Sequence, residues 1–319
     1  MLTKRFIFFL EKILLFGFQV MFWRILNSKK HKIKIFSEII NENRHKAVIN
    51  FLSKDFMSFI SNYKKNISHK QFQNQIPKQI WLCWWTGVDS MPSIVKACYN
   101  SVLINANDFH VTLITKDNYT NYISIPDHIL NKVNLKLMSL THFSNIIRMS
   151  LLEKYGGLWL DATIFFTGKI NIDDTFFFTV KRNYGSDNVA KQRWAGNCLG
   201  GVPDIYLFNF IKEFLFEYWI KYDFMVEHHL YDYSIALAYN LIPEIKEIFD
   251  CVNINNENYM ILGKCLEDEY DPVFFEKIIK DTIFHKLTWK KNISSFTSEN
   301  KLTFYGYLLQ NTHDITHKL

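Results

Sequence analysis

A single aspartate ends a strongly apolar stretch of this chain. Asp161 closes the run 158–161, Leu-Trp-Leu-Asp, and the glycine pair Gly156 and Gly157 stands just before it. An unpaired carboxylate is expensive to bury, so this one needs a cation, a hydrogen-bonding ligand or a strand end. The two glycines let the backbone turn from helix into strand and approach other groups closely. The pattern predicts a ligand-binding carboxylate beyond the carboxyl end of a buried strand.

The segment before the glycine pair is expected to be a helix that carries further polar groups. Residues 142–154 form this helix, Thr141 can serve as its N-cap, and the glycines end it. Asn145 and Arg148 are three residues apart and therefore share a helix face. The sequence predicts that this face points, together with His142, toward the strand ends.

Strands and helices alternate around this central segment. Strands are expected over 79–85, 109–115, 133–138, 158–166 and 176–180, and helices over 36–73, from Pro92 through Tyr99, over 205–222 and over 226–241. This alternation predicts an α/β fold with a mostly parallel central sheet. Neither an internal repeat nor a low-complexity linker divides the chain, so one domain is expected over 75–319, preceded by a helical N-terminal arm over 1–74.

Composition and charge exclude several classes of protein. The chain has 319 residues, of which 48% are hydrophobic and 21% charged, enough for one large core. Its five cysteines include no CxxC pair, which disfavours a disulfide framework or a zinc knuckle and indicates a reducing cytosol. The net charge of +6 is too diffuse for a nucleic-acid-binding stripe, but it suits anionic lipid or a phosphorylated ligand.

The first thirty-four residues combine apolar runs with basic residues. Residues 6–10 and 13–22 are apolar, but Lys12 and Arg24 leave a gap of only eleven residues between them. A membrane-spanning helix needs about 20 apolar residues. An apolar helix with basic ends fits one that lies in the interface of an anionic leaflet, whereas the alternative is a helix packed on the protein's own core. The arm is expected to attach the protein peripherally to the cytoplasmic face of the inner membrane.

The central block resembles a known bacterial family. Residues 142–148 (HFSNIIR), Leu151-Leu152 and 155–163 (YGGLWLDAT) are similar to the capsular polysaccharide synthesis family. That family is related to the glycosyltransferases of family 32 and, more distantly, to the clostridial glucosylating toxins. The resemblance continues in 76–81 (IPKQIW), 227–233 (EHHLYDY) and 285–290 (HKLTWK), and so covers roughly residues 75–290.

The resemblance implies a GT-A-like nucleotide-sugar-binding fold and a retaining hexose transfer. The donor would be a nucleotide sugar, and the acceptor a glycan or lipid-linked glycan in capsular or other surface polysaccharide synthesis. Asp161 matches the first aspartate of a DXD motif, which would bind the sugar nucleotide and a divalent metal, Mn²⁺ or Mg²⁺. Thr163 stands where the second aspartate would be, and a hydroxyl is a poorer ligand. The metal ligands implied are therefore Asp161, Thr163 and His285.

The same resemblance implies roles on the donor side of the site. Arg148 would contact the donor diphosphate or sugar, which suits its fixed cationic fork, although a surface salt bridge is the alternative. Asn145 would bear on recognition of the sugar hydroxyls, and the backbone at Gly157 would approach the donor. Trp81 would stack on the nucleotide base, worth about 1–3 kcal/mol, while core packing is the alternative for Trp81 and its neighbours Trp84 and Trp85. His285 would reach the diphosphate or the metal, with Lys286 or Lys290 as alternative phosphate contacts.

On the acceptor side, Glu227, His228 and Asp232 are expected on one helix. Asp232 or Glu227 could assist the acceptor hydroxyl as catalytic groups. An N-cap, a helix ion pair or a buried structural hydrogen bond would explain these residues equally well. A second hypothesis for the whole chain is a non-catalytic, membrane-docked component of a polysaccharide assembly complex that kept the fold and lost the metal.

Overall fold

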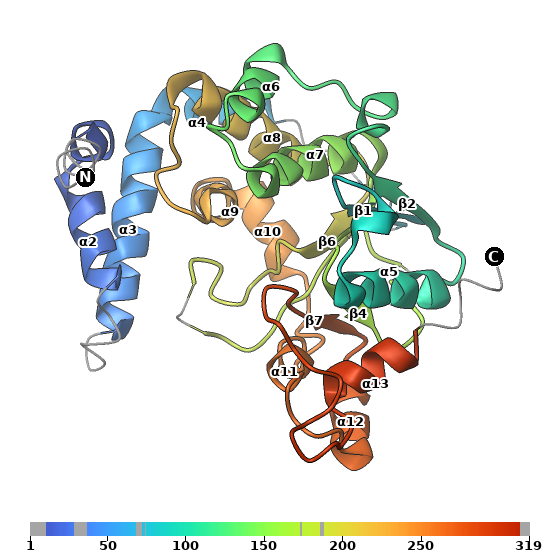
Figure 1. The fold of residues 1–319 in the computed structure, drawn as a ribbon. Coiled ribbons are helices and arrows are strands. Elements are labelled where there is room, and N and C mark those ends of the chain that lie inside the picture. The colour runs from blue at the N-terminus through green and yellow to red at the C-terminus, as the bar shows by residue number, and fades with distance from the viewer. Residues whose placement is uncertain are drawn as a thin grey trace.

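A five-stranded sheet lies at the centre of the computed structural model (Figure 1). Its order is β2-β1-β3-β6-β5, with β1 at Gln79–Cys83, β2 at His110–Ile114, β3 at Gly157–Asp161, β5 at Phe177–Thr179 and β6 at Cys198–Gly201. β1 pairs in parallel with β2 and β3, whereas β6 is antiparallel to both β3 and β5. Four strands therefore point the same way, which confirms the predicted α/β fold with a mostly parallel sheet. The structure describes residues 11–28, 37–67, 72–73, 75–172, 174–185 and 188–312.

Helices cover both faces of this sheet. Trp81 and Trp159 share a core with α7 (Leu140–Tyr155), α8 (Tyr206–Lys221) and α9 (Leu230–Leu241). Leu82 and Leu160 point to the opposite face, where α5 (Ser93–Asn105) packs with a two-stranded sheet of β4 (Ile164–Phe166) and β7 (Phe284–Lys286). Successive side chains of a strand alternate between faces. Asp161, two residues after Trp159, therefore points to the side of α7.

After α9, the described residues form four short helices and β7. Of these helices, α10 packs on α8 and α9, α11 packs on β7, and α13 packs on α5 (Figure 1). Their bounds are Pro243–Asp250 for α10, Ile261–Lys264 for α11, Pro272–Ile279 for α12 and Phe304–Gln310 for α13. Short 3₁₀ turns lie at Val88–Ser90 (η3) and Tyr119–Asn121 (η4).

The N-terminal arm is helical where it is described. α2 (Phe18–Ser28) and α3 (Ser37–Asp55) lie side by side along one flank of the molecule, and α4 (Met57–Asn66) follows (Figure 1). Val48 and Leu52 are buried in the same core as α8 and α9, and the Phe56 ring stacks on Tyr218. The arm thus shares its core with the rest of the chain. The boundary expected at residue 74 stays a prediction, and the expectations for residues 1–10 and 29–36 lie outside the described residues.

Several expected elements differ in the structure. The strand expected over 133–138 is wrong, because α6 (Asp127–Asn134) begins after Pro126 and its last turn runs into this segment. The strand expected over 158–166 is two strands in different sheets, since the chain turns at Ala162 and Thr163. Ser139, not Thr141, caps α7, because its side chain accepts a hydrogen bond from the backbone N–H of His142. β6 and β7 were not expected from the sequence.

Candidate active site

A cleft of about 730 Å³ opens beyond the carboxyl ends of β1 and β3. Cys83 and Asp161, the last residues of these strands, are paired in register and both line it. The cleft is therefore where ligands bind in open α/β sheets. Its wall comes from the end of β1, from α7, from the β3–β4 turn and from the segments around α11 and β7. The lining residues are Cys83–Thr86, Leu140, Thr141, Ser144, Asn145, Ile147, Arg148, Trp159, Asp161–Thr163, Met260, Gly263, Lys264 and Lys286–Lys290.

Arg148 and Asp161 form the innermost ion pair of this cleft. Arg148 Nη2 lies 2.6 Å from Asp161 Oδ1, and Trp159 Nε1 donates to the same oxygen at 3.0 Å. The guanidinium also donates to the carbonyl of Gly196, and it lies 4.9 Å from the Trp159 ring and 4.7 Å from the Tyr231 ring. Arg148 is enclosed, with 4% of its side chain exposed, whereas 32% of Asp161 is exposed. Asp161 is therefore held in one orientation and still faces the cleft.

Local electrostatics keep this pair charged. Burial, the largest single influence, would raise the pKa of Asp161, but Arg148, Lys286 and the Trp159 hydrogen bond together lower it below its usual value. For Arg148, burial opposes the charge, but Tyr231 and Asp161 outweigh it and raise the pKa. A carboxylate and a guanidinium that both stay charged at neutral pH are the consequence.

A second cation reaches Asp161 from β7. The pairing of β4 with β7 places Lys286 opposite Ile164, just after the turn at Thr163. Lys286 Nζ donates to Thr163 Oγ1 and lies 3.6 Å from Asp161 Oδ2. Lys264 and Lys290 also line the cleft. Among its lining residues, four cationic side chains thus face one carboxylate, so the cleft favours an anionic ligand.

The structure places His285 in the core instead of the cleft. It is fully buried, and its Nε2 lies 3.0 Å from Thr167 Oγ1 and 3.1 Å from the carbonyl of Thr282. Burial lowers its pKa to about 4. The reason is strand alternation, since Lys286 points to the cleft and its neighbour must point away. The sequence alternative, a phosphate contact by Lys286 or Lys290, matches the cleft geometry better.

The residues around Asp161 do not form a good divalent metal site. Of the three ligands implied by the resemblance, His285 is buried in the core, and the Thr163 hydroxyl accepts a hydrogen bond from the Lys286 ammonium. Across the residues that the structure describes, no group of three or more His, Cys, Asp or Glu side chains could hold a metal ion. Mg²⁺ and Mn²⁺ prefer several oxygen ligands. Asp161 alone, already paired with two cations, is a poor match.

Trp81 lies too deep to stack on a ligand in the cleft. It is 3% exposed, its Nε1 donates to the carbonyl of Gly156 at 2.9 Å, and its ring packs on Tyr122 and Tyr155. The core alternative therefore describes Trp81, because it stands two residues before the strand end. Its neighbours Trp84 and Trp85 line the cleft and are also partly buried against the core.

Of three other expectations on the donor side, the structure agrees with one and differs from two. Asn145 lines the cleft beside Arg148, as expected. His142 does not, because its ring packs on Trp219 and burial lowers its pKa to about 3. Gly157 begins β3 at the end opposite Asp161, and a Cβ there would lie 2.5 Å from the carbonyl oxygen of Gln79. This glycine permits close strand packing, away from the cleft.

Glu227 and Asp232 are not on one helix, because α9 begins at Leu230. Glu227 Oε2 lies 3.3 Å from Arg44 Nη1 and 3.8 Å from Arg24 Nε, so it joins the arm to the loop before α9. This carboxylate does not line the cleft. Asp232 lies closer to the site, where it accepts from Trp194 Nε1 at 3.2 Å, and burial raises its pKa.

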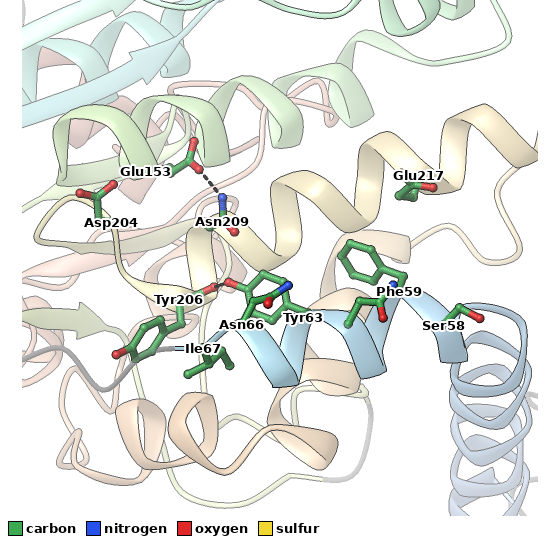
Figure 2. A pocket seen from close by; sticks show the side chains of 11 residues that line it. Ser58, Phe59, Tyr63, Asn66, Ile67, Glu153, Asp204, Tyr206, Asn209 and Glu217 are labelled. Carbon is green, nitrogen blue, oxygen red and sulfur yellow. Dashed lines mark hydrogen bonds between the residues drawn. The ribbon is translucent and has the colours of Figure 1, made fainter.

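A second cavity, of about 710 Å³, lies between α4, α8 and the end of α7 (Figure 2). Its charged lining residues are Glu153, Asp204 and Glu217, with no cation among the lining residues. Glu153 is already engaged by Asn209, as Figure 2 shows, and by Lys212. An acidic cavity repels phosphate, so the site for an anionic ligand is the cleft at Asp161.

Sequence reasoning missed several groups that line or support the cleft. Tyr231 holds the guanidinium of Arg148, and Trp289 lies at the rim with its ring 5.8 Å from that of Trp84. Lys264 comes from α11, far along the chain from Asp161. Nothing near Lys264 in the sequence marks it, whereas Trp289 and Lys290 lie in a stretch already singled out.

One family profile covers most of the chain. The profile described as "Capsular polysaccharide synthesis protein" matches residues 28–308, so the chain belongs to this family. Among solved structures, the one titled "PaToxG Glycosyltransferase" is similar with a TM-score of 0.42 and 10% identity, covering 77% of this chain and 100% of that one. No curated protein matches the sequence.

Proposed function

We propose that this protein is a glycosyltransferase that moves a hexose from a nucleotide sugar to a glycan or lipid-linked glycan during surface polysaccharide synthesis. The family supports the place in polysaccharide synthesis. One observation carries the chemistry: a cleft at the strand ends that is lined by Arg148, three lysines and a single carboxylate, Asp161. An excess of cations suits a bound diphosphate. A carboxylate held in one orientation, such as Asp161, can accept a hydrogen bond from a sugar hydroxyl.

In this proposal, different residues of the cleft contact different parts of the donor. The diphosphate lies against Arg148 and the lysines. Their attraction to the leaving group becomes stronger as that group gains negative charge. The carboxylate of Asp161, whose side chain is 32% exposed, accepts from a sugar or ribose hydroxyl, and Asn145 contacts a neighbouring hydroxyl. Trp84, Trp85 and Trp289 offer rings for the base or the sugar.

The transfer proceeds with retention in this proposal. Asp161 is the one carboxylate among the cleft's lining residues, and it is held by Arg148. The lining residues therefore offer no free carboxylate that could act as a nucleophile. A front-face reaction suits this arrangement, because the departing phosphate can itself take the proton of the acceptor hydroxyl. Asp232 does not line the cleft, so its assistance to the acceptor hydroxyl stays a prediction.

Binding of nucleotide sugars tests the proposal against the non-catalytic alternative. UDP-, GDP- and CMP-sugars are screened by thermal shift, and a donor that stabilises the protein is then assayed for hydrolysis and transfer. Asp161→Asn should abolish turnover, whereas Asp223→Asn, which breaks a surface pair with Lys132, should not. If no nucleotide sugar binds or turns over, the transferase proposal fails and the non-catalytic component is favoured.

We further propose that the arm docks on the cytoplasmic surface of the inner membrane. Phe18, Phe22 and Ile25 of α2 follow helical spacing and are exposed, by 68%, 42% and 38%. The basic Arg24 turns inward, toward Val226 and Glu227. An apolar face turned outward suits a lipid interface. In the described part of the chain no helix is long and apolar enough to cross a membrane.

Vesicle binding tests this docking. Phe18→Ser/Phe22→Ser should lose co-sedimentation with vesicles of anionic phospholipid. Leu135→Ser removes an equally exposed apolar side chain outside the arm and should bind as wild type does. Equal vesicle binding by all three proteins would contradict docking through α2.

A further inference from the structure

The Lys286 ammonium lies where the family pattern leads one to expect a metal. It contacts Thr163, at the position of the second DXD aspartate, and faces Asp161, at the position of the first. We infer that Lys286 supplies the positive charge that a divalent metal would supply, so that protein cations alone hold the donor diphosphate. This inference rests on the proposed transferase function.

The contacts of Asp161 carry the first part of the argument. Its Oδ1 accepts hydrogen bonds from Arg148 and Trp159, and its Oδ2 faces Lys286. A divalent ion bound to Asp161 would have to compete with a guanidinium for one oxygen or with an ammonium for the other. Because both cations are tethered to buried elements, α7 and β7, they are present without a binding equilibrium.

The hydroxyl at Thr163 carries the second part. A carboxylate at this position would neutralise Lys286 and offer a metal a second charged oxygen. Thr163 instead accepts one hydrogen bond from the ammonium and leaves its charge intact. Four cationic side chains against one carboxylate give the cleft lining a net charge of +3, counted from its lining residues. The cleft therefore has the charge for a diphosphate without a metal.

The bond changes balance without a metal. The bond between the sugar C1 and the phosphate oxygen breaks, and its electron pair stays on that oxygen. Lys286 donates a hydrogen bond to the oxygen and keeps its own proton. The acceptor hydroxyl oxygen bonds to C1, and its proton passes to the departing phosphate.

Donor turnover in EDTA and in MnCl₂ tests the role of Lys286. Wild type should turn over the donor equally in both. Lys286→Met keeps the aliphatic stem and should lower kcat by about 100-fold in EDTA, and Lys286→Arg should restore most of the loss. Lys291→Met is the matched control, because Lys291 pairs with Glu267 in solvent and lies outside the cleft lining. The melting temperature of each variant shows whether it is folded.

Creating a second carboxylate provides a readout that does not depend on turnover. Thr163→Asp/Lys286→Met should bind Mn²⁺ in a calorimetric titration, whereas wild type should not. A wild type that turns over donor only with Mn²⁺ would overturn the inference and leave the transferase proposal standing. A wild type that binds no nucleotide sugar, in EDTA or in Mn²⁺, would overturn both.

Discussion

Two arginine–carboxylate clusters in this protein are built from the same groups, but only one of them faces a cleft. In the first, Arg148 lies 2.6 Å from Asp161, whose side chain is 32% exposed. In the second, Arg44 and Arg24 lie 3.3 and 3.8 Å from Glu227, whose side chain is 11% exposed. Both carboxylates have lowered pKa values because neighbouring cations outweigh burial. Ion pairing and pKa therefore do not identify the reaction centre.

The two clusters differ in the net charge of their surroundings and in their exposure to solvent. Asp161 shares a cleft with lysines that have no second carboxylate there to neutralise them. Glu227 is enclosed between the arm and the loop before α9, where it joins segments far apart in the sequence. Unneutralised cations in an open cleft favour a ligand, whereas an enclosed pair contributes to stability only when both partners are present. Each cluster can therefore be broken with a different expected result.

Among the arginine substitutions that distinguish the two clusters, the largest effect is expected for Arg148→Ala. The substitution removes a cation from the diphosphate and the group that orients Asp161, so kcat should fall by about 10³-fold. Arg148→Lys keeps the charge without the planar fork and should retain only part of the activity. Turnover is measured at saturating donor, and the melting temperature reports folding. Arg44→Ala is the matched control, and a comparable loss of turnover per folded molecule there would contradict the distinction between the clusters.

Glu227→Ala should act on stability instead of turnover. It leaves two arginines without their carboxylate, one of them largely buried, and should cost about 3 kcal/mol of unfolding free energy. Urea unfolding of Glu227→Ala, Arg44→Ala and the double variant forms a cycle that isolates the pair. Additive losses in that cycle would show that the pair does not hold the arm. A fall in donor turnover of the folded variant would place Glu227 in the catalytic machinery.

The sequence predicts the centre of this fold well, because local patterns determine it. The apolar run before Asp161, the glycine pair and the helix spacing of Arg148 are local signals, and the structure has the expected helix and strand. The strand expected over 133–138 failed because a short apolar run does not distinguish a strand from the end of a helix. β7 is three residues long and pairs with β4, more than a hundred residues away, which no local pattern reveals.

The candidate site was harder to predict, because its groups depend on side-chain direction and on distant pairing. His285 and Lys286 are neighbours in sequence, and only the register with β4 decides which one faces Asp161. Trp81 was two residues too early in β1 to reach the cleft. Glu227 looked like a helix residue near Asp232, but its partners come from the arm, so sequence proximity misplaced it.

Acid unfolding tests the ion pairs of Glu227. Burial would raise the pKa of Glu227, but Arg24, the His228 N–H and Arg44 lower it below its usual value. Its contribution to stability is therefore complete above the usual pKa of a glutamate and is lost as the pH falls through the lowered folded pKa. Stability should change by at most about 1.4 kcal/mol per pH unit for this one group. Glu227→Gln should flatten the acid limb of stability below the usual pKa of a glutamate, measured by urea unfolding. An acid limb as steep as that of wild type would contradict a paired Glu227.

The smallest effect is expected from salt. Raising ionic strength from about 0.1 M to about 1 M shortens the screening length from about 10 Å to about 3 Å. The open, cationic cleft should then bind its donor several-fold more weakly, as calorimetric titration would measure. The difference in unfolding free energy between wild type and Glu227→Ala should change less, because the pair around Glu227 is enclosed. A donor affinity that is insensitive to salt would show that the lysines of the cleft do not hold an anionic group. An equal salt response of both clusters would mean that enclosure does not shield the ion pairs of Glu227 from salt. The two clusters would then differ only in the groups that Lys286 contacts.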